Sequence, residues 1–263
     1  MIRHTLANCK LGQLKNGVQM APRMIIDSLN VSSNSLDFKD KTDYTKLYTL
    51  NSNLLFNKNK IINFGGDHSI AISTLQATID VFPNTKVIWI DAHPDCNTYE
   101  ASISKNLHGM VLSHIFGLNK LFNFGYNKLD FKNIMYIGIR DLDLFEKKLI
   151  DNNNINFISV DEINNKPEKT AKKIMDFVDN HTVHLSFDVD SLDPKIISST
   201  GTPVINGIDY LSLNLFLSNL KLNKLKNADI VEFNPNLAVN DYKLYMELDM
   251  IKSIYHLIYN IMK

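Results

Sequence analysis

Cysteine is scarce in this chain: Cys9 and Cys96 are the only two among 263 residues, and neither stands in a C-x-x-C pair. Two thiols can form one disulfide at most, which excludes the disulfide framework that stabilises small secreted domains. We therefore expect both cysteines to be free thiols.

An excess of one charge and a long apolar run are also missing. Lysine plus arginine and aspartate plus glutamate both total 28, so no net charge attracts the protein to nucleic acid or to an anionic membrane. No apolar run is long enough to cross a bilayer, and the first residues, MIRHTLANCKLGQ, lack the apolar core of a signal peptide. We expect a cytoplasmic location, with neither nucleic acid nor membrane as a partner.

The sequence does contain short apolar runs that alternate with longer helical patterns. Hydrophobic residues make up 44% and charged residues 21%, as in an ordinary globular protein, and the length fits one domain at residues 1–263. The alternation predicts an α/β fold with a mostly parallel sheet. Strands are expected at residues 60–64, 86–91, 133–138, 156–159, 183–188 and 229–232. Helices are expected after Asp67, near His108, after Asp141, Pro167 and Asp209, and near Tyr245, with a polar surface excursion at residues 32–43.

Four segments that follow predicted strands are rich in possible metal ligands. They are GGDHS (65–69), DAHPDCN (91–97), FDVDSLDP (187–194) and EFNP (232–235). In an open parallel sheet, ligands bind beyond the carboxyl ends of the strands, so these segments can converge on one site. A single Asp-x-Asp or Asp-x-His is usually a solvated loop, but four such strand ends inside one α/β pattern predict a metal centre.

The spacing within these segments selects the ligands. Side chains two residues apart in extended backbone point to the same side, which places one set of ligands after each of two strands. The candidate ligands are His68, Asp91, His93, Asp95, Asp188 and Asp190. Two imidazoles and four carboxylates are too many for one tetrahedral zinc and suit two ions that share carboxylates. Because oxygen atoms dominate the set, manganese is the expected metal.

The order of these motifs resembles the ureohydrolases, the family that includes arginase and agmatinase. The matching segments cover most of the chain: GQLKNGVQMAP, GGDHS, DAHPDCN, SKNLHGM, YIGIRDLD, SFDVDSLDP, TGTPV and EFNP. The resemblance implies a three-layer fold with a central parallel eight-stranded sheet flanked by helices, assembled as a homo-oligomer, a trimer or a hexamer. It also implies that the same six ligands hold two Mn²⁺ ions per subunit.

The resemblance further implies that the chain is an arginase, which hydrolyses L-arginine to L-ornithine and urea by attack of a hydroxide that bridges two manganese ions. His108, an imidazole that titrates near neutral pH, is expected to carry the proton that the leaving amine needs. Glu232 ends a predicted strand, and we expect its carboxylate to bind the guanidinium group by paired hydrogen bonds rather than a buried partner such as Arg140.

The expected substrate follows from residues that match the amino-acid end of an arginine site. Asn97, Ser104 and Asp143 match residues that bind the α-carboxylate and α-amino groups, which a decarboxylated substrate does not need. Thr202 is implied to place a hydroxyl beside the guanidinium site.

Two features depart from the family, and three alternatives remain open. Lys15 stands where the family has an arginine, and the family's apolar first strand corresponds to the polar residues 2–7. The first alternative is agmatinase or another guanidino hydrolase with the same metals. The second is a deacetylase-like enzyme of related fold with one zinc ion, and the third is an inactive ureohydrolase-like scaffold. Substrate trials and the number of bound metal ions separate these alternatives.

Overall fold

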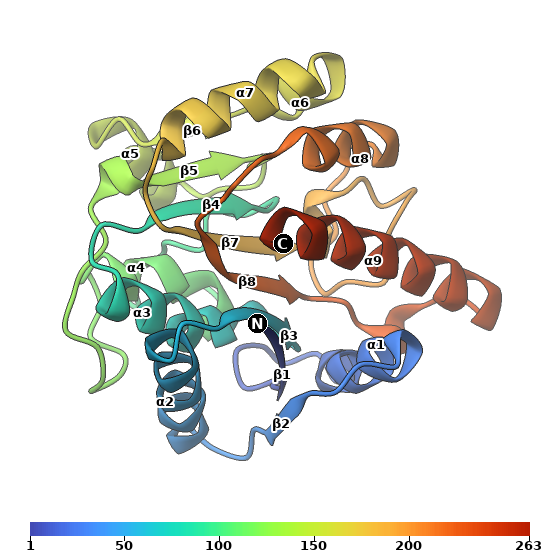
Figure 1. Ribbon diagram of the computed structural model, residues 1–263, viewed down its shortest axis with the longest axis horizontal. Coiled ribbons are helices and arrows are strands. Elements are labelled where there is room, and N and C mark those ends of the chain that lie inside the picture. Colours follow the sequence, from blue (N-terminus) through green and yellow to red (C-terminus); the bar gives the residue numbers. More distant parts are fainter.

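Eight strands form one sheet in which every hydrogen-bonded pair is parallel, in the order β2-β1-β3-β8-β7-β4-β5-β6 (Figure 1). The computed structural model describes residues 1–263. The strands are β1 (Ile2–Asn8), β2 (Asn34–Asp37), β3 (Lys60–Gly65), β4 (Lys86–Ile90), β5 (Ile134–Ile137), β6 (Asn156–Ile158), β7 (Val183–Asp188) and β8 (Leu225–Val231). The expected α/β class with an eight-stranded parallel sheet is therefore confirmed.

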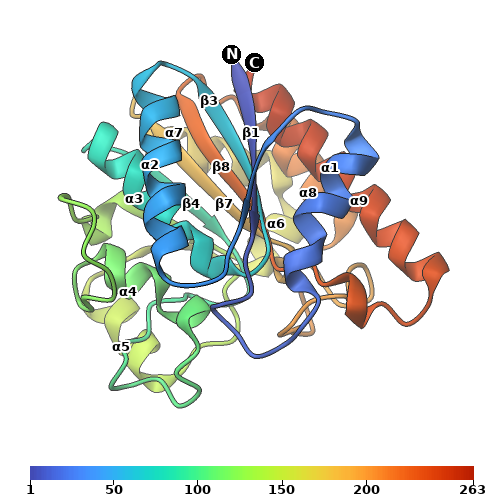
Figure 2. The ribbon, with the colours of Figure 1, turned by 90° about the horizontal axis from the view of Figure 1, so that it is seen from below.

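Helices cover both faces of the sheet and give the molecule three layers (Figure 2). One face carries α2 (Thr42–Phe56), α3 (Ala71–Val81), α4 (Val111–Ile115) and α5 (Leu144–Asn152). The other carries α1 (Ala21–Leu29), α6 (Val160–Asn165), α7 (Pro167–Val178), α8 (Tyr210–Asn219) and α9 (Asp241–Met262). Short 3₁₀ turns are η1 (Val18–Met20), η2 (His68–Ile70), η3 (Leu107–Met110), η4 (Phe131–Asn133), η5 (Val189–Ser191) and η6 (Pro235–Leu237). None of the helices combines the length and the hydropathy needed to span a membrane.

The two faces of the sheet form separate hydrophobic cores because side chains alternate along each strand. On β4, Ile88 and Ile90 pack into the core beneath α7, α8 and α9, whereas Val87 and Trp89 pack into the core beneath α3 and α4. All four side chains are buried, which is typical of a parallel strand covered on both faces. This burial explains why the strand reads as a continuous apolar run.

The first strand can be polar and still lie inside the sheet, because its polar side chains have buried hydrogen-bond partners. Residues 2–8 form β1, which lies inside the sheet between β2 and β3. Thr5 donates a hydrogen bond to the Asn63 side chain, and His4 Nε2 lies 3.0 Å from the hydroxyl of Tyr255 on α9. The polar excursion expected at residues 32–43 contains the edge strand β2.

The sheet order explains why distant motifs meet. The four ligand-rich segments follow β3, β4, β7 and β8, and these strands are consecutive in the sheet as β3-β8-β7-β4. Since all strands are parallel, the four carboxyl ends lie along one edge, where loops leave the sheet. The site is built at this edge.

Candidate active site

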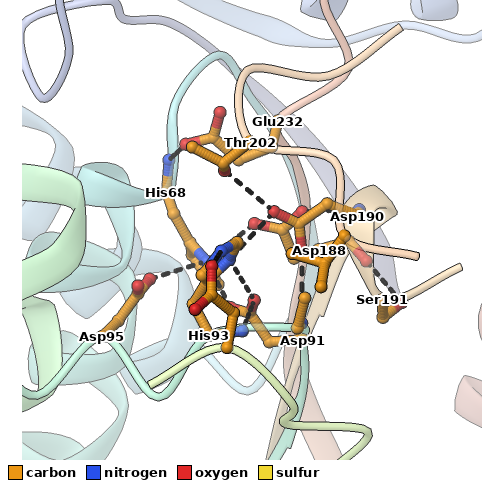
Figure 3. A network of polar contacts seen from close by, with 12 residues as sticks. His68, Asp91, His93, Asp95, Asp188, Asp190, Ser191, Thr202 and Glu232 are labelled. Carbon is orange, nitrogen blue, oxygen red and sulfur yellow. Dashed lines mark hydrogen bonds and ion pairs between the residues drawn. The ribbon is translucent and has the colours of Figure 1, made fainter. Parts of the chain in front are cut away.

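One histidine at this edge is surrounded by carboxylates. His68 Nδ1 lies 3.1 Å from Asp91 Oδ2, Asp95 Oδ2 and Asp188 Oδ2 (Figure 3). The nitrogen is fully buried and has no hydrogen-bond partner, although three carboxylates surround it. A buried nitrogen that faces three oxygens without a hydrogen bond fits metal coordination, and His68, Asp91 and Asp188 lie close enough together to hold one ion.

A second histidine forms a neighbouring group that shares a carboxylate with the first. His93 Nδ1 lies 3.1 Å from Asp190 Oδ2 and 3.6 Å from Asp91 Oδ1, and these three residues also lie within the range of one ion. Asp91 therefore presents Oδ2 to His68 and Oδ1 to His93. A carboxylate shared in this way is the arrangement that holds two adjacent cations.

The six predicted ligands meet, but the reason given by residue spacing was incomplete. Strand β4 ends at Ile90, and Asp95 has a φ of 46°, so residues 91–95 do not continue as extended backbone. Asp190 lies in the 3₁₀ turn η5 rather than in a strand, and its backbone N–H donates to Asp188 Oδ1 over 2.8 Å. Tight turns at the strand ends bring these side chains together, and not the alternation of side chains along extended backbone.

Groups behind His68 fix the orientation of its ring. Ser186 Oγ lies 2.8 Å from His68 Nε2, on the side away from the carboxylates. When Nε2 carries the proton and donates a hydrogen bond to Ser186, the lone pair of Nδ1 is free to bind a cation. The ring also stacks on Trp89, at 4.2 Å between centroids and 5° between planes, while Trp89 Nε1 donates to Asp91 Oδ2 over 3.0 Å. Trp89 thus holds both the ring and the carboxylate of two candidate ligands, His68 and Asp91.

The electrostatics of the cluster indicate a demand for positive charge. Burial and the charge of Asp91 raise the pKa of Asp95 to about 6. Burial and the neighbouring carboxylates also raise the pKa of Asp188 and that of Asp190. Burial opposes the charged form of His93, yet Asp190 and Asp91 raise its pKa to about 12. Bound cations would relieve the repulsion among these carboxylates, so the residues present fit two metal ions.

Arg140 does not neutralise the cluster as an ordinary ion-pair partner. Its guanidinium group donates to backbone carbonyls, including Asp190 O and Val204 O, both over 2.8 Å. It also donates to Ser191 O over 3.2 Å. Arg140 thus holds the loop that carries Asp190, and it forms no contact with Glu232. The alternative in which Arg140 is the partner of Glu232 is wrong.

Glu232 and His108 form a pair beside the metal groups. His108 Nδ1 lies 3.0 Å from Glu232 Oε1, and the backbone N–H of His68 donates to the same oxygen over 2.8 Å. Glu232 has a φ of 69°, a conformation unusual for a residue other than glycine, and its N–H donates to Gly66 O over 2.8 Å. Although burial alone would raise it, the pKa of Glu232 is lowered by the charge and hydrogen bond of His108.

The predicted residues for the rest of the substrate lie in different places. A pocket of about 120 Å³ is lined by His93, Asp95, Asn97, His108, Gly109, Glu146, Asp188, Asp190 and Thr202. Asn97 Nδ2 donates to Asp143 Oδ2 over 2.7 Å, and Thr202 Oγ1 donates to Asp190 Oδ2 over 3.2 Å. Ser104 is exposed and outside this lining, and its hydroxyl accepts the N–H of Asn106. The structure therefore joins Asn97 with Asp143 but leaves Ser104 apart.

Sequence reasoning missed one carboxylate of the pocket. Glu146 is 5% exposed, and burial raises its pKa to about 8. It belongs to a capping box with Asp143 at the start of α5, and its Oε1 accepts the N–H of Cys96 over 3.2 Å. The spacing D-x-x-E is a signal for a helix start, and this signal could have identified Glu146. Helix α5 begins at Leu144, whereas it was expected to begin directly after Asp141.

Other expectations near the site are also resolved. Cys9 and Cys96 are free and buried, and Cys96 packs in a hydrophobic core. Asp193 accepts the N–H groups of Lys195 and Gly207, a structural role outside the ligand set. Asp67 caps the turn that carries His68 by accepting the N–H of Ser69.

Comparisons with known proteins place this geometry in a family. The sequence profile of the Arginase family matches residues 1–255. Arginase from Bacillus subtilis is 36% identical, over 93% of this chain and 94% of that protein. Arginase from Entamoeba histolytica is 40% identical over 187 residues, which cover 68% of this chain and 63% of that protein. The match to Plasmodium falciparum arginase spans 51% of that relative, at 37% identity over 76% of this chain.

Solved structures agree with the sequence comparisons. The crystal structure of Entamoeba histolytica arginase in complex with L-ornithine has a TM-score of 0.83 at 31% identity and covers 97% of both chains. That of Bacillus subtilis arginase has a TM-score of 0.80 at 29% identity and covers 96% of this chain and 97% of that one. The family profile spans nearly the whole sequence, and the chain therefore belongs to the arginase family.

Proposed function

We propose that this protein is an arginase, which hydrolyses L-arginine to L-ornithine and urea with two Mn²⁺ ions per chain. The observation that carries the proposal is the sharing of Asp91 between two histidine–carboxylate groups, with the Glu232–His108 pair beside them. Relatives across much of the sequence are arginases, and one of the similar structures holds L-ornithine.

The metal groups would hold the two ions through side chains of this chain alone. We assign His68, Asp91, Asp95 and Asp188 to one ion and His93, Asp91 and Asp190 to the other. When bound, two divalent ions lower the pKa of a water molecule and so supply a nucleophile at neutral pH. Four carboxylates and only two imidazoles favour manganese over zinc.

Glu232 is the residue that would bind and orient the guanidinium group. Its carboxylate is buried, and its lowered pKa keeps it charged, so a planar cation can be held by charge-assisted hydrogen bonds. The backbone N–H of His68 donates to Oε1 and fixes the carboxylate next to a metal ligand. Glu232 would thereby place the guanidinium carbon next to the two groups of metal ligands. Holding the reacting groups in this geometry is the positioning contribution to the rate of hydrolysis.

His108 would supply the proton that the leaving amine requires. Burial opposes its charged form, but Glu232 raises its pKa to about 9, so the imidazole is protonated at neutral pH. Its side chain is 15% exposed, which leaves a route for protons from solvent. A protonated imidazole at the edge of the pocket can donate to the nitrogen that leaves as ornithine and recover its proton from water.

The amino-acid end of L-arginine would be held at the far side of the pocket. Asn97 and Asp143 form a hydrogen-bonded pair, in which the Asp143 carboxylate can attract an α-ammonium group and Asn97 can interact with an α-carboxylate. Ser104 is exposed and lies outside the pocket lining, so its hydroxyl is proposed to complete this end on the family resemblance alone. Thr202 would lie at the guanidinium end of the substrate, because its hydroxyl contacts Asp190, one of the proposed metal ligands.

We further propose a homo-oligomer, a trimer or a hexamer. Large side chains just before α9 and in its first turns offer a surface for another subunit: Val239, Tyr242 and Tyr245 are 77%, 75% and 65% exposed. Light scattering on the purified protein would measure the number of subunits, and a monomer at micromolar concentration would contradict this proposal. The cytoplasmic location stays a prediction.

The test is urea release from manganese-loaded protein offered L-arginine and agmatine separately, with metal content measured on the same sample. We expect urea from L-arginine and two ions per chain. Urea from agmatine instead would show the sister activity, and a single ion would favour the one-metal alternative. No urea from either substrate despite two bound ions would contradict the proposal.

A further inference from the structure

The loop that follows β1 crosses the carboxyl edge of the sheet and contacts three parts of the site. Gly12 N donates to Asp67 Oδ2 over 2.9 Å, and Gly12 O accepts the N–H of His108 over 3.2 Å. Lys15 Nζ donates to Gly201 O, in the segment that carries Thr202. We call residues 9–17 the N-terminal loop. It is tied to the turns that carry His68, His108 and Thr202.

One side chain of the N-terminal loop reaches the carboxylate of Glu232. Gln13 Nε2 donates to Glu232 Oε2 over 2.6 Å, and Gln13 is 9% exposed. The amide oxygen of Gln13, Oε1, faces Gly201. A Cβ atom added to Gly201 would lie 2.9 Å from this oxygen. Because a carboxylate oxygen only accepts, the amide atom next to Glu232 must be the NH₂ group. The orientation of the Gln13 side chain is thus fixed.

Counting acceptor positions on Glu232 shows what this hydrogen bond controls. A carboxylate has about four lone-pair positions, two on each oxygen. Oε1 receives the N–H of His68 and faces His108 Nδ1, so both of its positions are engaged. Oε2 receives Gln13 alone. The acceptor position that remains for a substrate is on Oε2, and Gln13 decides in which direction it points.

We propose that Gln13 is a positioning residue that orients the Glu232 carboxylate for a planar guanidinium group. This inference rests on the proposed function, in which Glu232 binds the guanidinium. Gln13 does not touch the substrate in this role. It holds the carboxylate against rotation, so that the free position on Oε2 faces the incoming N–H groups. The role belongs to the guanidinium end and is the same for any guanidino substrate that the enzyme accepts.

Two substitutions separate this role from simple packing. Gln13→Met keeps the length of the side chain but removes the donor. Gln13→Glu keeps its shape and replaces the NH₂ group by an oxygen, which repels the Glu232 carboxylate. A residue that only fills space would leave KM unchanged in Gln13→Met. A matched control is Leu14→Ala, since the Leu14 side chain in the same loop is 89% exposed.

The experiment measures kcat and KM for L-arginine on manganese-loaded wild type and variants, with metal content and thermal midpoint on each sample. We expect KM to rise on the order of tenfold in Gln13→Met and at least as much in Gln13→Glu, with a smaller change in kcat, because the lost hydrogen bond involves a charged group and acts on substrate binding. Metal content should stay at the wild-type level in both variants.

The outcomes separate failure of this inference from failure of the proposed function. Wild-type KM in both Gln13 variants would overturn the positioning role, and so would a loss of activity that follows lost metal or lost stability. An equal rise in KM in Leu14→Ala would overturn it too. Wild-type protein that releases no urea from L-arginine or agmatine would overturn the proposed function itself.

Discussion

His108 Nδ1 lies 3.0 Å from Glu232 Oε1, so the residue predicted to carry protons and the residue predicted to bind the guanidinium group are direct partners. They come from segments 124 residues apart, the turn η3 and the end of β8. In the proposed mechanism the contact couples substrate binding to proton transfer, because a guanidinium group at the free position of Glu232 Oε2 and His108 at Oε1 share one carboxylate. A substrate held on Oε2 would then lie beside the imidazole that is proposed to protonate the leaving amine.

The titration of His108 tests this pair directly. Burial lowers the imidazole pKa, but the charge and hydrogen bond of Glu232 outweigh this effect and raise the pKa to about 9 in the folded protein. We expect Glu232→Gln to bring the pKa of His108 down, since the opposing charge is lost. NMR titration of the metal-free protein would measure the shift, and an unchanged pKa would contradict the pairing.

The same pair gives a pH dependence of stability. The folded pKa of about 9 lies above the ordinary histidine value of 6.5, so the stabilisation is fully present below pH 6.5 and is lost as pH rises through 9. We expect the difference in thermal midpoint between wild type and Glu232→Gln, both metal-free, to shrink between pH 6.5 and pH 10. A constant difference across this range would show that the pair does not titrate as described.

Removal of one histidine ligand should remove metal. His93→Ala takes away the only imidazole of the second group, and we expect bound manganese to fall from two ions towards one and kcat to fall at least about 100-fold. His256→Ala is the matched control because His256 is an exposed histidine on α9. Metal analysis after dialysis measures the result, and two ions retained in His93→Ala would refute the assignment.

Asp143 should act on both substrate choice and helix stability. It caps α5 by accepting the N–H groups of Phe145 and Glu146, and it accepts a hydrogen bond from Asn97. Asp143→Ala should lower the free energy of unfolding by about 1 kcal/mol, whereas Asp143→Ser, which retains a capping oxygen, should not. We expect both variants to lower kcat/KM for L-arginine about tenfold. Unchanged kcat/KM in Asp143→Ser would remove Asp143 from the substrate site.

A buried hydrogen-bonded pair behind the site should contribute to stability. His184 Nε2 lies 3.0 Å from Asp229 Oδ2, both residues are fully buried, and Thr74 also donates to this oxygen over 2.7 Å. Asp229→Leu leaves these donors without a partner and should cost about 3 kcal/mol, or about 6–12 °C in thermal midpoint. Calorimetry on Asp229→Leu beside the helix-cap variant Asp209→Ala, expected to lose about 1 kcal/mol, would measure the contrast. Equal losses would mean that the buried pair contributes no more than a cap.

Element types were predictable where the apolar pattern is strong. Strand β7 has the expected bounds of Val183–Asp188, and α7 and α8 begin where Pro167 and Asp209 indicate. Helices α1, α2 and α6 were not predicted. Strand β1 was hard to recognise because its polar residues are satisfied by partners far along the chain, such as Asn63. Local sequence does not contain those partners.

The sequence by itself determined which residue types could form the site: the six candidate ligands and Glu232 were selected at strand ends, since parallel strands must present those ends at one edge, and His108 was selected in the segment NLHG by its resemblance to the family. Only the tertiary structure decided how the side chains meet. The sharing of Asp91 between two histidines, the positive φ values of Asp95 and Glu232, and the contact of Gln13 with Glu232 depend on strand order and loop paths. These features join residues up to 219 positions apart, and no local pattern encodes such a contact because it depends on how the whole sheet is assembled.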